Sequence, residues 1–286
     1  MAPRTATLIG LTAILMWSLL SVLTVATGTI PPFQLMGMTF AIGVMASLVV
    51  RPSALMFNQP WLASLIGVGG LFGYHALYFV ALRLAPPAEA GLLNYLWPLL
   101  IVLFSSLLPG EHLRVHHVIG ALLGLIGTVL LLAGNLNLAA SSSQVAGFAA
   151  ALAAAFVWAG YSVLSRRLRE VPTDAVVRNC AAAALLAFAV HLFTEDTAWP
   201  SGPLAWAAII ALGVGPVGAA FFAWDIGMKR GDIRVLGAAS YATPLLSTSF
   251  LILAGFAQAS ANIAVAAALI AGGGLIAAKD MIRKRG

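Results

Sequence analysis

The sequence has very few charged residues. Of its 286 residues, 15 are Lys or Arg and 9 are Asp or Glu, whereas 61% are hydrophobic and the mean hydropathy is +0.99. A chain with so few charges lacks the polar side chains that cover a water-soluble domain. The composition therefore predicts a polytopic membrane protein surrounded by the lipid bilayer.

Cysteine and catalytic motifs are also scarce. Cys180 is the only cysteine, which excludes an internal disulfide and is most simply a small apolar filler. The sequence contains no recognisable pair of nucleophile and base, and no lysine in the middle of an apolar run that could form a Schiff base. We expect neither an enzyme nor a protein with a cofactor.

Three histidines raise the question of a metal site. His112, His116 and His117 lie in or beside one predicted loop, but no carboxylate or thiol cluster accompanies them in the sequence. Zinc sites usually need three or four such ligands. A solvated loop is the simpler interpretation, and no metal is expected.

Long apolar runs make up most of the chain. A hydrocarbon core of about 30 Å needs roughly 20 apolar residues per helix, and the charged, Pro-rich and Ser-rich breaks divide the chain into ten such runs. The predicted spans are 6–26, 32–50, 61–83, 88–108, 116–134, 145–164, 175–193, 205–228, 234–254 and 262–278.

Positive charge is distributed unevenly between the predicted loops. If the N-terminus is cytoplasmic, 14 of the 15 Lys and Arg residues fall in cytoplasmic segments, and Arg83 is the exception. This positive-inside bias predicts both termini in the cytoplasm of a multi-pass protein in the bacterial inner membrane. The net positive charge of the chain is then explained by its membrane topology, so no nucleic-acid partner is expected.

The two halves of the chain resemble each other. Residues 91–100 read GLLNYLWPLL and residues 237–246 read GAASYATPLL, 146 positions later; residues 17–23 (WSLLSVL) and 158–164 (WAGYSVL) are a second echo. Five spans per half is an odd number, so the second half enters the membrane from the opposite side. We predict an all-α membrane protein in which two inverted five-helix repeats, residues 1–139 and 140–286, form one domain around a central cavity.

A proline interrupts the helix in each copy of the first echo. Pro98 cannot donate a hydrogen bond to the carbonyl of Asn94, and Pro244 cannot donate to that of Ser240. In lipid, a bare carbonyl persists only where a helix, side chain, water or solute meets it. Two broken helices at matching places predict a transport site at the repeat interface.

Few polar or aromatic side chains lie at mid-membrane depth. Tyr74 and Tyr78 share one helical face, and His75 is the only histidine deep inside a span, where it could pack, relay protons or bind substrate. The aromatic side chains could also simply fill the core. The candidate substrate-binding residues are Trp17, Tyr74, His75, Tyr78, Asn94, Tyr95, Trp97, Pro98, Trp158, Trp224, Ser240, Tyr241 and Pro244.

The predicted cavity contains no Lys, Arg, Asp or Glu. Phosphates and divalent cations need charge compensation, so the cavity suits a small amphipathic solute instead. Outside it, Asp225 precedes Lys229 by four residues, which favours an intrahelical ion pair, with a coupling-ion site as the alternative. Arg83 can reach an outer acidic residue such as Glu89, Glu195 or Asp196.

These features resemble a known family. Ten spans in two inverted halves with Tyr95-x-x-Pro98 and Tyr241-x-x-Pro244 are similar to the drug/metabolite transporter superfamily in its EamA form, and Tyr74-His75-x-x-Tyr78 is similar to its aromatic amino-acid exporters. The resemblance implies a basket-shaped bundle with a cavity lined by spans 1, 3, 4, 6, 8 and 9. The site residues that it carries over are Trp17, Tyr74, His75, Tyr78, Tyr95, Trp97, Pro98 and Trp158.

The resemblance also implies a function. It implies export of neutral, mainly aromatic, amino acids and related amphipathic metabolites by alternating access, and we expect a monomer. Thr243 replaces Trp97 in the second half, and Ala220 replaces Tyr74, so the aromatic pocket is weighted toward the first half. A multidrug exporter of lipophilic cations and a membrane scaffold without transport activity are the alternatives.

Overall fold

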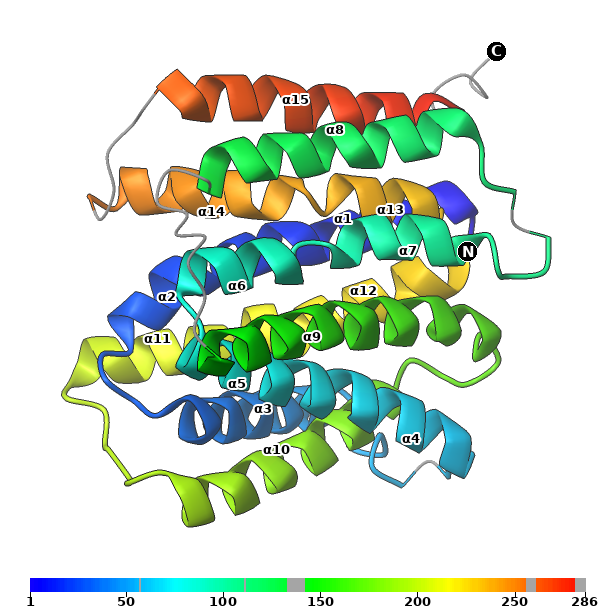
Figure 1. The fold of residues 1–286 in the computed structure, drawn as a ribbon. Coiled ribbons are helices and arrows are strands. Elements are labelled where there is room, and N and C mark those ends of the chain that lie inside the picture. The colour runs from blue at the N-terminus through cyan, green and yellow to red at the C-terminus, as the bar shows by residue number, and fades with distance from the viewer. Residues whose placement is uncertain (57, 111, 133–141, 256–260, 281–286) are drawn as a thin grey trace.

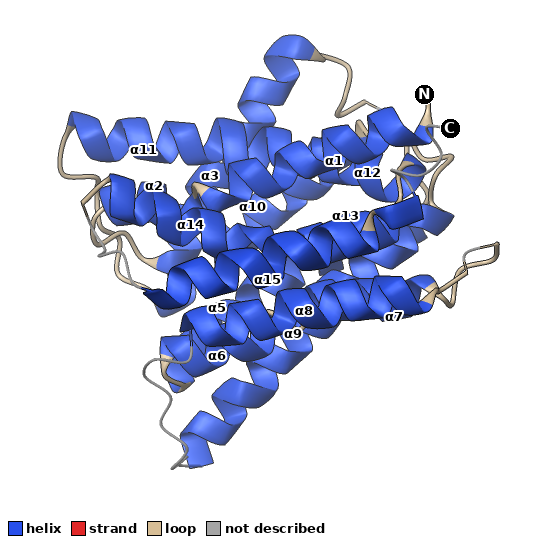
Figure 2. Ribbon diagram, turned by 90° about the horizontal axis from the view of Figure 1, so that it is seen from above, coloured by secondary structure: helices blue, strands red, loops and turns tan. Residues whose placement is uncertain are grey.

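The computed structural model describes residues 1–56, 58–110, 112–132, 142–255 and 261–280. Within these ranges all regular structure is helical (Figure 2), which confirms the predicted all-α class. Seven helical segments are long and apolar enough to cross a membrane, and three shorter apolar helices cover residues 89–105, 115–130 and 263–277. These segments coincide with the ten predicted spans. The predicted boundary at residues 139 and 140 lies outside the described residues.

Figure 1 labels the helices in chain order. The first are α1 (Pro3–Ser18), α2 (Leu20–Ala26), α3 (Pro32–Val50), α4 (Trp61–Val68), the π-helix η1 (Gly69–Gly73), α5 (Tyr74–Leu84), α6 (Pro87–Asn94), α7 (Trp97–Ser105) and α8 (Val115–Leu132). They are followed by α9 (Ser142–Arg167), α10 (Ala175–Thr194), α11 (Pro203–Val214), the π-helix η3 (Gly215–Ala219), α12 (Ala220–Arg230), α13 (Ile233–Ala239), α14 (Ala242–Leu253) and α15 (Ala261–Ala277).

Both predicted proline breaks are present. One helix ends at Asn94 and the next begins at Trp97, and in the second half one ends at Ala239 and the next begins at Ala242. Pro98 and Pro244 thus lie in the first turn of a new helix, where a missing N–H has no intrahelical partner to lose. Both prolines are buried in the protein.

Two π-helices were not predicted. They interrupt the third and eighth apolar segments at Gly69–Gly73 and Gly215–Ala219, and their starts are 146 residues apart, the same offset that relates the proline motifs. A π-helix widens the turn and frees carbonyl groups, and such bulges are frequent at functional sites. The local signal was the Gly-Gly pair at residue 69 and Gly215-Pro216 at its repeat position.

Most of the close helix packing joins one half of the chain to the other. The helix α1 packs on α12, α5 on α9, α3 on α10, α7 on α13 and α8 on α15. Small residues allow this approach. A Cβ atom placed on Gly273 would lie 2.5 Å from the carbonyl oxygen of Gly120, and one placed on Gly227 would lie 2.8 Å from the Cα of Gly10. The packed interior therefore lies between the halves.

The two ends of the bundle differ. One end, which we call the basic end, contains Arg51, Arg114, Arg166, Arg230 and Arg234, and there α7 and α13 pack directly on each other. Toward the other end the continuing helices separate, because α6 packs mainly on α9 whereas α14 packs mainly on α1. The broken helices therefore meet at the basic end and diverge at the opposite end (Figure 1).

The contact between α8 and α15 generates a test. The substitution Gly273→Ala places a methyl group against the Gly120 carbonyl, and overpacking of this kind costs about 1–3 kcal/mol. Gly272→Ala and Gly274→Ala are matched controls on the same helix, because a Cβ atom there meets nothing within 4 Å. We expect the thermal midpoint of the detergent-solubilised protein to fall only for Gly273→Ala. Equal midpoints for the three variants would contradict the packing.

Candidate functional site

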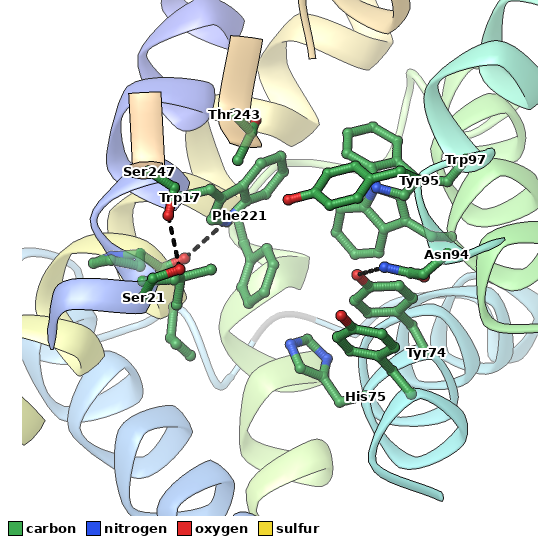
Figure 3. A pocket seen from close by; sticks show the side chains of 15 residues that line it. Trp17, Ser21, Tyr74, His75, Asn94, Tyr95, Trp97, Phe221, Thr243 and Ser247 are labelled. Carbon is green, nitrogen blue, oxygen red and sulfur yellow. Dashed lines mark hydrogen bonds between the residues drawn. The ribbon is translucent and has the colours of Figure 1, made fainter. Parts of the chain in front are cut away.

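A cavity of about 230 Å³ lies in the middle of the bundle (Figure 3). Its walls come from the first, third, fourth, sixth, eighth and ninth apolar segments, which is the set that the family resemblance implies. The lining residues are Trp17, Leu20, Ser21, Tyr74, His75, Tyr78, Asn94, Tyr95, Trp97, Trp158, Pro216, Val217, Phe221, Thr243 and Ser247. Eight of the thirteen predicted residues are among them, and none of the fifteen is charged at neutral pH if His75 is neutral.

One wall of the cavity is aromatic. The rings of Tyr74 and Tyr78 stack with their centroids 6.1 Å apart and their planes at 14°, as expected for positions i and i+4 of α5. The Tyr74 ring also lies 5.1 Å from that of Trp158 on α9. Figure 3 shows Tyr95 and Trp97 continuing this wall from the break between α6 and α7. The proline break thus turns two rings toward one hollow.

A cluster of tryptophans closes the cavity toward the basic end. Trp17 and Trp158 meet edge to face with centroids 5.5 Å apart, and Trp224 lies behind them, 5.0 Å from Trp17 and 6.3 Å from Trp158. The indole of Trp224 donates a hydrogen bond to Ser162 Oγ at 3.0 Å. Trp224 was predicted to bind substrate, but it is 1% exposed and does not line the cavity. It supports the rings that do.

The opposite wall carries hydroxyl groups. The hydroxyl of Ser247 on α14 donates to that of Ser21 on α2 at 2.7 Å, and Figure 3 shows Thr243 close above them. The sequence analysis missed all three, because Ser and Thr are common in membrane helices and only the rotation of α2 and α14 turns these inward. The cavity therefore has an aromatic side and a hydroxyl side.

The π-helices present carbonyl oxygens to the cavity residues. The indole N–H of Trp17 donates to the carbonyl of Pro216 in η3 at 3.0 Å, and Nδ1 of His75 lies 2.6 Å from the carbonyl of Leu71 in η1. A carbonyl can only accept, so Nδ1 carries the proton, and Nε2 of a neutral His75 is left as an acceptor. The two repeat-related bulges thus fix the orientation of two cavity side chains.

Two buried polar atoms in the cavity wall have no hydrogen-bond partner among the described residues. They are Oδ1 of Asn94 and Oγ1 of Thr243, in side chains that are 3% and 9% exposed. The amide nitrogen of Asn94 is engaged, because it donates to the Tyr74 hydroxyl at 3.1 Å. An unpaired buried polar atom costs about 1–3 kcal/mol, and both side chains belong to the cavity lining.

Four other predicted residues lie outside the lining. Pro98, Ser240, Tyr241 and Pro244 are buried in or beside the helix breaks. Ser240 donates to the carbonyl of Leu236 at 2.7 Å, and the ring of Tyr241 packs on α8, where a Cβ atom on Gly124 would approach it to 2.5 Å. These residues shape the breaks, while Leu20, Pro216, Val217 and Phe221, which the sequence analysis also missed, line the cavity.

The charged pairs lie away from the cavity. Lys229 and Asp225 form the predicted intrahelical ion pair at 2.9 Å, and Arg83 binds Glu195 at 2.7 Å, as one of its expected partners. Both predictions are confirmed. Each pair lies near the end of a membrane-spanning segment.

The histidine interpretation needs a correction. Asp280 approaches His116 at 3.3 Å, and the ligand atoms of His116, His117 and Asp280 lie within 4.8 Å of one another, so a carboxylate does accompany these histidines. His117 is also buried rather than solvated, and its Nδ1 accepts the backbone N–H of Arg114. Only the fold brings residue 280 to residue 116. Arg114 binds the same carboxylate at 2.9 Å and would compete with a cation.

Comparison with known proteins agrees with this architecture. The model of the EamA-like transporter family matches the chain twice, at residues 4–133 and 145–279. The aromatic amino acid exporter YddG of Ancylobacter novellus is 54% identical over 97% of this chain and 98% of its own length. The protein of the same name from Escherichia coli (strain K12) is 28% identical over 96% of this chain and 97% of its own.

A solved structure shares the fold. A protein of known crystal structure superposes with a TM-score of 0.92 at 53% sequence identity, over 96% of this chain and 99% of that chain. The relatives are named as exporters and the matching family is one of transporters, so the chain is not an enzyme. With both halves matched by the same model and a relative 54% identical along nearly all of its length, this chain belongs to the EamA-like transporter family.

Proposed function

We propose that this protein exports neutral, mainly aromatic, amino acids and related amphipathic metabolites across the bacterial inner membrane. The observation that carries the proposal is the mid-bundle cavity, which has an aromatic wall, a hydroxyl wall and no carboxylate, lysine or arginine in its lining. Its volume of about 230 Å³ is below the range of roughly 300–1,000 Å³ that is typical of sites for drug-sized ligands. The names of the YddG relatives support this substrate class.

The proposed architecture is ten spans in two inverted five-helix repeats, residues 1–139 and 140–286, with both termini cytoplasmic. Three observations support it. The family model matches the chain twice, and the two π-helices begin 146 residues apart. The contacts are also symmetric: α1 and α9 occupy equivalent positions in the two halves, as do α5 and α12, and α1 packs on α12 as α9 packs on α5. An odd number of spans per repeat requires the inversion.

The packing of the broken helices supports our proposal of alternating access. The segments α7 and α13 close the basic end, and α6 and α14 separate toward the opposite end. We infer that this conformation opens outward and that rocking of the halves exchanges the open end. We also propose that the exporter works as a monomer, with the cavity between the two halves of one chain.

The binding mode follows from the unpaired atoms. In the proposed pose the solute ring lies among Tyr78, Tyr95 and Trp158, and its ammonium group donates to Oδ1 of Asn94. Thr243 is in reach of the opposite polar group of the solute, because Figure 3 places it across the cavity from Asn94. A lipophilic cation would gain the same ring contacts. It would have no acceptor for a hydrogen bond from the Thr243 hydroxyl.

The aromatic wall is tested by truncating it. Trp97→Ala and Tyr78→Ala each remove a ring from the lining, and loss of about 1–3 kcal/mol of contact lowers phenylalanine counterflow in proteoliposomes by roughly fivefold to 150-fold. Trp199→Ala is the matched control, because its ring is 74% exposed. Unchanged flux in the cavity variants would favour the scaffold alternative, and dye uptake without amino-acid flux in the unmodified protein would favour the multidrug exporter.

The role of Asn94 is tested with Asn94→Leu, which keeps the size of the side chain and removes the acceptor. A hydrogen bond to a charged group contributes about 1.5–3 kcal/mol, so the KM for phenylalanine rises at least roughly tenfold. Inhibition by 3-phenylpropionate, which lacks the ammonium group, stays within about twofold. The substitution Thr248→Val is the control, since that hydroxyl bonds to the Pro244 carbonyl of its own helix. Equal losses for both ligands would contradict the assignment.

A further inference from the structure

A buried ion pair lies at the basic end, away from the central cavity. Nζ of Lys229 is 2.9 Å from Oδ2 of Asp225, and the two residues are 6% and 5% exposed. The ammonium also donates to the carbonyl of Val171 at 2.8 Å, and the hydroxyl of Thr173 donates to the same Asp225 oxygen at 2.8 Å. Removing two charges from water is costly even when they pair, so a pair kept inside a membrane-spanning helix calls for a function.

Lys229 separates two hollows. The outer one, at the basic end, has a volume of about 340 Å³ and is lined by Arg166, Arg169, Glu170, Lys229 and Arg230, four cations and one carboxylate. The inner one holds about 20 Å³, and its walls include Lys229, Asp225 and Tyr161. Lys229 thus has one side toward a basic surface hollow and the other toward the interior.

The inner hollow leads toward the central cavity. The ring of Tyr161 in its wall lies 5.4 Å from that of Trp158, which lines the cavity. The inner hollow is walled by residues of α4, α9, α10 and α12, and Lys229, Tyr161 and Trp158 follow one another from the basic surface hollow toward the cavity.

Hydrogen bonds join the ends of α9 and α12 beside the basic surface hollow. Arg166 at the end of α9 donates to the carbonyls of Met228 and Gly231 at 3.3 and 2.8 Å, and Lys229 holds the Val171 carbonyl of the following loop. These bonds tie the end of α9 and its loop to the end of α12 (Figure 1). A solute carboxylate that replaced Asp225 as the partner of the Lys229 ammonium would weaken the hydrogen bond from Lys229 to the Val171 carbonyl.

Resting on the proposed export function, we propose that the basic hollow is a second binding site, which takes the carboxylate of the solute at the cytoplasmic face, with Lys229 as its inner ligand. The five lining residues carry a net formal charge of +3, or +2 once Asp225, the partner of Lys229, is counted, and a positively charged hollow concentrates small anions and zwitterions. The central cavity lining holds no Lys or Arg for a carboxylate, so the charge that selects it lies here. Lysine suits the role, because its compact charge sits on a flexible stem.

The test uses the double variant Asp225→Asn/Lys229→Gln, which keeps hydrogen-bonding groups and removes both charges without stranding either one. In inside-out vesicles, which expose the basic end, the KM for phenylalanine rises about tenfold and the preference for phenylalanine over phenylalaninamide disappears. In right-side-out vesicles neither quantity changes. The matched control is Arg83→Gln, the cation at the repeat-equivalent position, which leaves the inside-out KM unchanged.

A binding measurement separates this inference from the proposed function. With acetate as the probe, which carries a carboxylate and no ring for the central cavity, the thermal midpoint of the solubilised protein rises in the unmodified chain and in Trp97→Ala, but not in the double variant. If the unmodified protein transports no amino acid, the export function fails while this shift still tests the site. An unchanged inside-out KM, or a midpoint shift that survives in the double variant, would overturn the second site.

Discussion

The backbone's need for hydrogen bonds in lipid is the constraint on which this structure depends. A membrane-spanning helix can leave its regular ladder only where protein, water or solute meets the freed groups. Here the ladder is broken at Tyr95 and Tyr241 and widened at η1 and η3, and each of the four irregularities contains or adjoins a buried residue: Asn94, Tyr241, Leu71 and Pro216. The cavity is lined from two of them, at residues 94–97 and at Pro216. The backbone groups that cannot face lipid therefore lie where a polar solute can form hydrogen bonds with the protein.

The cavity also depends on how the halves share their interior. The closest helix pairs join one half to the other, so neither half has a separate core that would hold its shape alone. Glycines such as Gly227 and Gly273 bring these pairs into backbone contact. The same inter-half pairing explains why the cavity lies where the halves meet.

Charge is kept out of the centre and placed at the ends. The lining of the cavity carries no Lys, Arg, Asp or Glu, whereas Lys229 and Asp225 pair near one end and Arg83 and Glu195 at the other. A neutral zwitterion, the proposed solute, fits this distribution, because an amide and hydroxyls in the centre can meet its charges. The cost of desolvating fixed charges in the centre is avoided.

The sequence by itself determined the helical class, the limits of the apolar segments, the two proline breaks and eight of the cavity residues. These follow from local chemistry, because apolar run length and the missing N–H of proline act within one helix. Only the tertiary structure decided which faces turn inward. It placed Ser21, Thr243 and Phe221 in the lining, moved Trp224 and Tyr241 behind it, and brought Asp280 to His116. Helix rotation is set by packing between segments more than a hundred residues apart, as for Trp17 and Pro216, and no local pattern records it.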